Sequence, residues 1–317
     1  MENDFESVRR TLSDALDEVE SKRLELRKKG CRNGLIVAAV LLGSATAVTL
    51  WSGSPAALIV GAVAALVAGP LTANAPSSEL NRYYKRRIVA RIVRAVCGEQ
   101  ATFDPADGIA EETFRACGLF DTRPDRYRSE DLVCGSSGQT PFRFAEVHAQ
   151  ERRTTTDSKG RTRTHWVDIF RGFLFLADFH KDFRGRTLVC RDSWFRLRFD
   201  DCRRVRLENP QFEQLFDVYS NDAVEARYLL SPSTMERLVR LDTRFRRGIT
   251  ASFHRSCIVI AIPDSTNHFE AGLWRSVRRT DRLEREFDTI RMLKGIVEDL
   301  DLNTRIWSKT APAALPE

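Results

Sequence analysis

The segment 33–78 contains no Asp, Glu, Lys or Arg, although 30% of this 317-residue chain is charged. The turn-forming residues 52–55 divide it into two apolar runs, 34–51 and 56–73. Each run approaches the roughly 20 residues with which a helix crosses about 30 Å of hydrocarbon. A charge at the centre of such a helix would cost about 2.5 to 3.5 kcal/mol. The segment 33–78 is therefore predicted to form a transmembrane helical hairpin.

Two other interpretations of this segment remain open. The alanine and glycine content would also suit a helical hairpin buried inside a soluble domain. The small residues 73–75 resemble a signal-peptide cleavage site, but a charged amino-terminal segment and both apolar runs precede them. The membrane hairpin is the interpretation that we adopt.

Basic residues flank the hairpin on both sides, whereas the turn between the two runs carries none. Because cytoplasmic flanks are enriched in Lys and Arg, both termini are predicted to be cytoplasmic, with two spans in the inner membrane. These cations could serve only to set the topology. Alternatively, they could also bind anionic lipid, with an attraction of about 1 kcal/mol for each cation near the membrane surface. The candidate lipid contacts are Lys28, Lys29, Arg32, Lys85, Arg86 and Arg87.

Residues 1–32 are predicted to form an amphipathic cytoplasmic helix with a coiled-coil-like apolar stripe. Its apolar positions are Phe5, Val8, Leu12, Ala15, Val19 and Leu26, with Lys22 interrupting the stripe. The stripe could mediate self-association or pack against the carboxy-terminal helix of the same chain. Residues 79–100 are predicted to form a basic juxtamembrane helix.

Residues 101–308 are predicted to form a cytoplasmic α+β domain with an antiparallel sheet and packed helices, because short strand patterns occur without regularly alternating helices. Polar residues 154–165 are predicted to be a loop at the tip of a long hairpin. Strands are expected at 186–192, 203–208, 215–220, 224–230, 249–254 and 257–262. Helices are expected at 233–245, begun by Ser231 with Pro232 or by Ser233 with Glu236, and at about 267–302. Residues 309–317 are predicted to be a disordered tail.

The composition excludes several classes of site. The net charge of +6 comes from 50 Lys and Arg against 44 Asp and Glu, which is a modest excess for a nucleic-acid-binding protein. The seven scattered cysteines favour free thiols, and the spacing of the five histidines gives no metal motif. Phosphate-binding, dinucleotide-binding and esterase motifs do not occur, so we expect no cofactor and no metal. The loop 134–140 is more typical of a turn than of an anion cradle.

Two further sets of residues are candidates for function. A catalytic site could be built from Tyr219, Asp222, Glu225 and Arg227, although their spacing is better explained by a strand, a turn, a second strand and a capped helix. Lys159, Arg161 and Arg163, at the tip of the long hairpin, could contact a phosphate-bearing surface such as lipid or nucleic acid, and nucleic acid is the less favoured.

The order of these segments resembles the bacterial domain-of-unknown-function family 3137. The resemblance rests on the two-span hairpin, on "YRSEDLVCG" and "FRGFLFLADF", and above all on "RLENPQFEQLFDVYSNDAVEARYLLSPSTMERL". It extends over residues 33–262. Membership implies a membrane-anchored bacterial protein with a cytoplasmic α+β domain, and it implies no activity and no catalytic residue.

The sequence therefore predicts a membrane-anchored cytoplasmic binding or scaffold protein. Its expected partners are the lipid bilayer and either a protein or a second copy of the chain, bound through the amino-terminal helix. The alternative is a membrane-bound enzyme that uses Tyr219, Asp222, Glu225 and Arg227.

Overall fold

The computed structural model describes residues 5–156, 160–179, 181–191, 201–246 and 248–302. Lys159 and the predicted tail 309–317 lie outside these residues. The chain divides into two compact units. Met1–Ile92 and His268–Phe287 form the first, which we call the helical unit. Val93–Asn267 and Asp288–Glu317 form the second, which we call the sheet unit.

The helical unit begins with two helices in series, continues through the hairpin and ends with a segment from much later in the chain. Its elements are α1 (Phe5–Thr11), α2 (Ser13–Ser52), α3 (Ala56–Asn74), α4 (Ser77–Tyr84), a π-helical turn η1 (Lys85–Val89), the start of α5 (Ala90–Cys97) and the first half of α10 (Thr280–Lys294). From Ser13 onward, the predicted arm and the first predicted span are one uninterrupted helix, α2.

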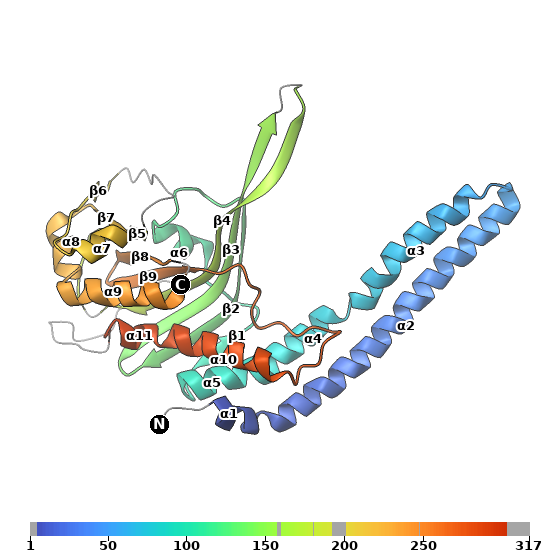
Figure 1. Cartoon of the computed structure of the whole chain (residues 1–317), viewed down its shortest axis with the longest axis horizontal. Helices are drawn as coiled ribbons and strands as arrows, with labels where there is room; N and C mark the ends of the chain where they lie inside the picture. The colour runs from blue at the N-terminus through green and yellow to red at the C-terminus, as the bar shows by residue number, and fades with distance from the viewer. Residues whose placement is uncertain (1–4, 157–159, 180, 192–200, 247, 303–317) are drawn as a thin grey trace. The chain divides into compact units, whose positions relative to one another are not determined.

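The predicted hairpin is present as α2 and α3, joined at Gly53, whose positive φ of 70° ends α2 (Figure 1). Both helices are long and apolar enough to cross a membrane. Only 11% and 17% of their most apolar windows are buried in the protein, so these windows are not the core of a soluble domain. Leu50, Trp51 and Leu66 are each more than three-quarters exposed.

The apolar stripe of the amino-terminal arm is buried within the helical unit. Leu12, Val19 and Leu26 are each at most 2% exposed, and the Phe5 ring lies 5.7 Å from that of Phe287 in α10. This packing corresponds to the intramolecular alternative. Self-association through the arm stays a prediction.

The sheet unit contains one nine-stranded sheet in the order β1-β2-β3-β4-β9-β8-β5-β7-β6, in which every pair of neighbours is antiparallel. The strands are β1 (Thr102–Asp104), β2 (Arg126–Ser137), β3 (Thr140–Thr156), β4 (Thr162–Asp178), β5 (Arg186–Arg191), β6 (Arg203–Arg204), β7 (Phe216–Ser220), β8 (Thr250–His254) and β9 (Cys257–Pro263). The helices are α6 (Glu111–Ala116), α7 (Pro210–Leu215), α8 (Ala223–Leu229), α9 (Pro232–Phe245) and α11 (Ile296–Asp299), with parts of α5 and α10. The predicted α+β class with an antiparallel sheet is confirmed.

Both faces of the sheet bury apolar side chains. On one face Ala145, Val147 and Leu174 pack with Phe114 of α6. Because side chains alternate along a strand, Phe144 and its register partner Phe175 lie on the opposite face, where both are fully buried.

The hairpin of β3 and β4 is longer than predicted. The sequence interpretation placed a polar loop at 154–165, but Thr154, Thr155 and Thr156 pair with Thr164, Arg163 and Thr162. Threonine suits a strand because its branched side chain packs well on a pleated surface, and this outweighs the polarity of the segment. Figure 1 shows the resulting ribbon extending from the sheet.

Two predicted elements are wrong. The segment 224–230 is helix α8 rather than a strand, because Asp222 caps it by accepting from the backbone N–H groups of Val224 and Glu225. The predicted helix at 267–302 is divided: α10 begins at Thr280, and Gly295 separates it from α11. Phe269, with a φ of 59°, stands in the irregular part that precedes α10.

Three smaller predictions have mixed outcomes. Gly135–Ser137 of the predicted glycine-serine loop lie within β2, and the turn is Gly138–Gln139. The strand predicted at 203–208 is the short β6, Arg203–Arg204. Helix α9 is confirmed, and of the two predicted starts it uses Ser231 as the N-cap with Pro232 in the first turn.

Candidate functional site, an apolar groove in the helical hairpin

The two helices of the hairpin approach each other through small side chains. A Cβ atom added to Gly34 would lie 2.7 Å from the carbonyl oxygen of Gly69, and one added to Gly61 would lie 2.2 Å from the Cβ of Ala45. Both distances are too short for a real side chain, so glycine is required at these positions. Small residues at such contacts are typical of membrane helix pairs, where close packing replaces the hydrophobic driving force.

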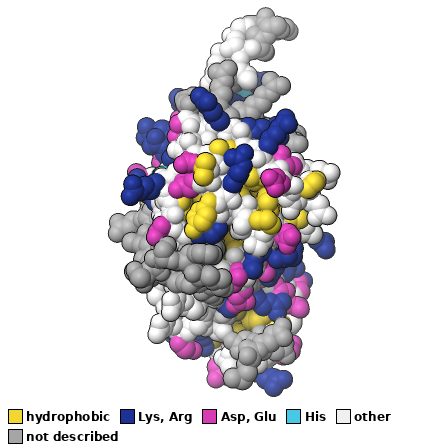
Figure 2. All heavy atoms as spheres, turned by 90° about the vertical axis from the view of Figure 1, so that its left-hand side faces the viewer, with side chains coloured by type: hydrophobic (Ala, Val, Ile, Leu, Met, Phe, Trp, Pro, Cys, Tyr) yellow, Lys and Arg dark blue, Asp and Glu magenta, His cyan; other side chains and the backbone are white. Residues whose placement is uncertain are grey.

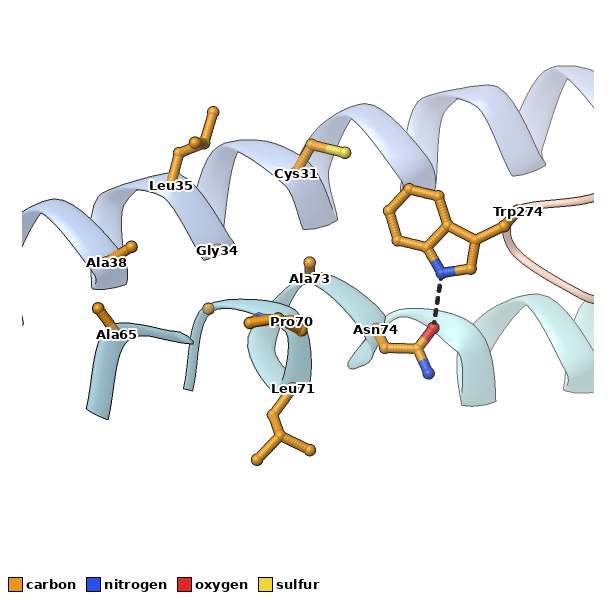
Figure 3. Close-up of a pocket in the computed structure, with 11 residues that line it drawn as sticks. Cys31, Gly34, Leu35, Ala38, Ala65, Pro70, Leu71, Ala73, Asn74 and Trp274 are labelled. Atoms are coloured by element: carbon orange, nitrogen blue, oxygen red, sulfur yellow. Dashed lines mark hydrogen bonds between the residues drawn. The ribbon is translucent and has the colours of Figure 1, made fainter. Parts of the chain in front are cut away.

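Where these small residues reach the surface, the hairpin is hollowed into an apolar groove of about 770 Å³ (Figure 3). Its volume lies within the range of about 300–1,000 Å³ that ligand pockets occupy. The lining residues are Cys31, Gly34, Leu35, Ala38, Ala65, Gly69, Pro70, Leu71, Ala73, Asn74 and Trp274. All but Trp274 come from α2 and α3, so the groove is a property of the hairpin.

Trp274 lies at the end of the groove nearest the carboxyl end of α3, in the segment that precedes α10 (Figure 3). Its indole N–H donates to the side-chain oxygen of Asn74 at 3.2 Å. The polar atom of the indole is therefore satisfied, and the ring presents carbon to the groove. The sequence interpretation did not single out Trp274, because no local pattern places residue 274 beside α3.

A buried ion pair holds this segment on α2. Arg23 makes two hydrogen bonds to Glu20, at 2.6 and 3.0 Å, and donates a third to the carbonyl oxygen of Leu273. The backbone N–H of Val277 donates to Glu20. We call Glu20 and Arg23 the clamp. It fixes the residues on either side of Trp274, and the hydrogen bond from Arg23 lowers the pKa of Glu20.

A second buried acid in the helical unit has the opposite pKa shift. Glu286 accepts a 2.5 Å hydrogen bond from the hydroxyl of Tyr84 and pairs with Arg282 at 3.3 Å. Burial nevertheless raises the pKa of Glu286 above its usual 4.5. The raised pKa of Glu286 means that the folded protein holds this proton more tightly than the unfolded chain. The resulting contribution to the free energy of unfolding is complete at pH values below the unfolded-state pKa of Glu286. It is lost as the pH rises through the folded-state pKa.

We therefore expect Glu286→Gln to remove part of the pH dependence of stability. The wild-type midpoint of thermal unfolding, compared with that of the variant, should fall as pH is raised from 4 to 7. Circular dichroism of the detergent-solubilised chain measures both midpoints. A difference between wild type and variant that is constant over this range would contradict the raised pKa.

The six predicted lipid contacts differ in their surroundings. Lys28, Lys29, Arg32 and Arg86 are exposed, and none has an acidic partner within the described ranges. Arg87 is exposed and pairs with Glu18 at 3.0 Å. The sixth predicted lipid contact, Lys85, is 5% exposed among buried residues of η1, so its burial argues against that role.

The four predicted catalytic residues make contacts of a structural kind. Asp222 caps α8, and Glu225 accepts from the backbone N–H groups of Arg184 and Gly185 at 2.9 and 2.6 Å. Arg227 donates to the carbonyl oxygen of Ala223, and Tyr219 lies on β7 against the core. These bonds hold a loop and a helix in place, which is a structural role.

A capping role makes a specific prediction for Asp222. Asp222→Ala should lower the free energy of unfolding by about 0.5–2 kcal/mol, because the first turn of α8 loses its acceptor. Asp222→Asn keeps an acceptor and should remain close to wild type. Denaturant unfolding of the three chains measures the difference. A large loss in the asparagine variant would show that the negative charge is needed for more than capping.

Polar and charged groups of the sheet unit are otherwise dispersed. On the side that carries α7, α8 and α9 in Figure 1, Figure 2 shows basic and acidic side chains interspersed, with a few apolar ones between them. Within the described part of the chain no group of His, Cys, Asp and Glu could hold a metal ion. Arg161 and Arg163 are exposed at the end of the β3–β4 ribbon.

Comparison with known families addresses the carboxy-terminal half of the chain. Residues 168–302 match the model of the family described as "Protein of unknown function (DUF3137)". In this segment the chain is similar to DUF3137. The match contains both the "FRGFLFLADF" strand and the stretch 206–238 that carried the resemblance, which is confirmed there. The DUF3137 match does not include the hairpin or the strands before residue 168.

One solved structure is similar to the chain at a distance. The crystal structure of the mycobacterial trehalose monomycolate transport factor A, TtfA, aligns with a TM-score of 0.34 and 11% sequence identity. The alignment covers 68% of this chain and 97% of that one. No curated protein matches the chain.

Proposed function

We propose that this chain is a membrane-anchored binding protein. In this proposal α2 and α3 cross the cytoplasmic membrane with both termini on the cytoplasmic side, and the sheet unit engages a partner at the membrane surface. The observation that carries this proposal is the surface of the hairpin. Its two helices are long and apolar, and their apolar side chains are exposed. Exposed cations flank the apolar runs at the ends away from the turn. A bilayer with an anionic surface satisfies both features.

Extraction from membranes tests the anchor. The chain should remain in the membrane pellet at alkaline pH and float with reconstituted vesicles. Leu66→Arg should weaken insertion by about 2.5–3.5 kcal/mol, because the charge would lie within α3. Leu24→Arg is the matched control, since Leu24 is exposed on α2 before the apolar run. Release of the wild-type chain by alkaline extraction would overturn the proposed anchor.

Thiol labelling tests the topology. Burial raises the pKa of Cys97, Cys117 and Cys190 to about 12, so these thiols should react slowly. The seventh cysteine, Cys257, is only 1% exposed. With Cys31, Cys134 and Cys202 replaced by serine, Ser54→Cys in the hairpin turn should react with an impermeant maleimide from outside the cell. Thr266→Cys should react after lysis only. Labelling of Thr266→Cys in intact cells would overturn the orientation.

For the partner of the sheet unit, the β3–β4 ribbon is the element that we propose to contact an anionic membrane surface. Arg161 and Arg163 are exposed at its end, and anchoring would keep them near lipid head groups. A fluorophore can be attached at Thr162→Cys in the same chain, in which Cys31, Cys134 and Cys202 are replaced by serine. Its fluorescence should change on contact with lipid in anionic nanodiscs but not in zwitterionic ones. Arg161→Gln with Arg163→Gln should abolish the difference. Equal signals in both nanodiscs would exclude this contact, and a response to added nucleic acid instead would reassign it.

A further inference from the structure

We propose that the groove between α2 and α3 binds one acyl chain of an anionic phospholipid, whose head group is held by Lys28 and Arg32. This inference rests on the bilayer insertion proposed above and names a lipid that the hairpin would bind individually. The lipid would differ from those that merely surround the helices in having both its chain and its head group in contact with the protein.

The shape and chemistry of the groove suit a hydrocarbon chain. Gly34 and Gly69 lie at a close contact between the two helices, and neither brings a side chain into the groove. Leu35 and Leu71, which are 72% and 68% exposed, border it. Among the lining residues only Asn74 and Trp274 carry nitrogen or oxygen in their side chains, and these two are bonded to each other. A lining that is mostly hydrocarbon suits an apolar ligand.

The direction of the groove matches the orientation of a lipid in one leaflet. Trp274 and Asn74 lie at its end toward the basic flank, and Ala38 and Ala65 lie farther into the apolar runs (Figure 3). Tryptophan is enriched at the boundary between head groups and hydrocarbon, because its ring is amphipathic. A chain that enters beside Trp274 and extends toward Ala38 would follow the neighbouring chains of the bilayer.

The charge beside the groove is complementary to an anionic head group. Lys28, Arg32 and Leu35 follow one another at helical spacing, so both cations lie on the side of α2 that borders the groove. Each helical turn rises about 5.4 Å, which places the cations one and two turns from Leu35. Both are exposed, and neither has an acidic partner in the described residues. A phosphodiester at this level would pair with the guanidinium and the ammonium.

Photo-crosslinking of the full chain in nanodiscs tests the site. The probes are phosphatidylglycerol and phosphatidylcholine that carry a diazirine in one acyl chain, each diluted in unlabelled phosphatidylcholine. Mass spectrometry should find label from phosphatidylglycerol concentrated on the groove residues. Lys28→Gln with Arg32→Gln should reduce it by about fivefold or more, because each cation contributes to holding the anion. A fatty acid with the same chain tests whether a carboxylate suffices.

Matched variants separate the groove from the rest of the lipid-facing surface. Leu35→Ala with Leu71→Ala removes the borders of the groove. Leu50→Ala with Leu66→Ala removes equally exposed leucines of the same helices that do not line it. Ala38→Phe should fill the groove, whereas Ala39→Phe places the same ring on an exposed position outside it. Only the groove variants should lose the label.

The outcomes distinguish the possible failures. Label spread evenly over all lipid-facing residues would overturn the site while leaving the anchor intact, as would equal labelling by both probes. Failure of the chain to enter nanodiscs would overturn both the anchor and this inference. A second copy of the chain is the other possible occupant, and a disulfide-linked dimer through Cys31, which lines the groove, would assign the groove to that copy instead.

Discussion

Replacing Arg23 by alanine is expected to lower the free energy of unfolding of the helical unit by about 3–5 kcal/mol. Arg23 is 4% exposed, and its loss would leave the Glu20 carboxylate buried without its cation and the carbonyl of Leu273 without its donor. Thermal unfolding followed by circular dichroism should show the midpoint falling by about 6 °C or more, as expected when several kcal/mol are lost from a chain of this size.

An exposed ion pair between the same two parts of the chain provides the control. Arg278 pairs with Asp17 at 2.8 Å, and both side chains are more than half exposed. Arg278→Ala should cost no more than about 1 kcal/mol, because water already screens this pair. Similar losses for Arg23→Ala and Arg278→Ala would show that the clamp is solvated and that Trp274 is held by other contacts.

The second large effect is expected at Gly30. A Cβ atom at this position would lie 2.2 Å from the carbonyl oxygen of Ala73, a backbone atom that cannot rotate away. Gly30→Ala should therefore force α2 and α3 apart and destabilise the hairpin by about 1–3 kcal/mol, as overpacking does. Resistance of the purified chain to unfolding in dodecyl sulfate measures this loss.

Gly43, on the same helix, is the matched control. A Cβ atom there would meet nothing within 4 Å. Gly43→Ala should stabilise α2 by about 0.5–1 kcal/mol, because alanine has the higher helix propensity. Two alanine substitutions in one helix are thus expected to act with opposite signs. Stabilisation by both would mean that α2 and α3 do not pack as the structure shows.

The sequence correctly predicted those elements in which the pattern of apolar and polar residues matches the burial in the structure. The hairpin is marked by a long absence of charge, and α9 by Ser231 and Pro232. The prediction failed at 224–230, where alternating apolar residues imitate a strand. Val224 is 79% exposed and Tyr228 47% exposed, so that alternation does not reflect a buried face, and the cap at Asp222 decides in favour of a helix.

The groove could be predicted only in part. The alanine and glycine content of the hairpin was evident in the sequence, and the cations that flank it were predicted as lipid contacts. Trp274 could not be placed, because it reaches α3 from about 200 residues away through the clamp. A partial signal was present at Glu20 and Arg23, since Arg23 follows Val19 by four residues and precedes Leu26 by three. That spacing places a charge on the apolar stripe of the arm.

The unbroken course of α2 has a mechanical consequence. Forty residues at 1.5 Å each make a shaft of about 60 Å. The clamp lies on this helix at Arg23, about eleven residues or 16 Å before the apolar run begins at Gly34. No proline lies within α2, so α2 would tilt as one rigid helix. Tilting of the hairpin in a bilayer would then also move the clamp, which lies on the same helix. In the proposed membrane insertion, a change in the tilt of α2 would therefore displace the segment that carries Trp274.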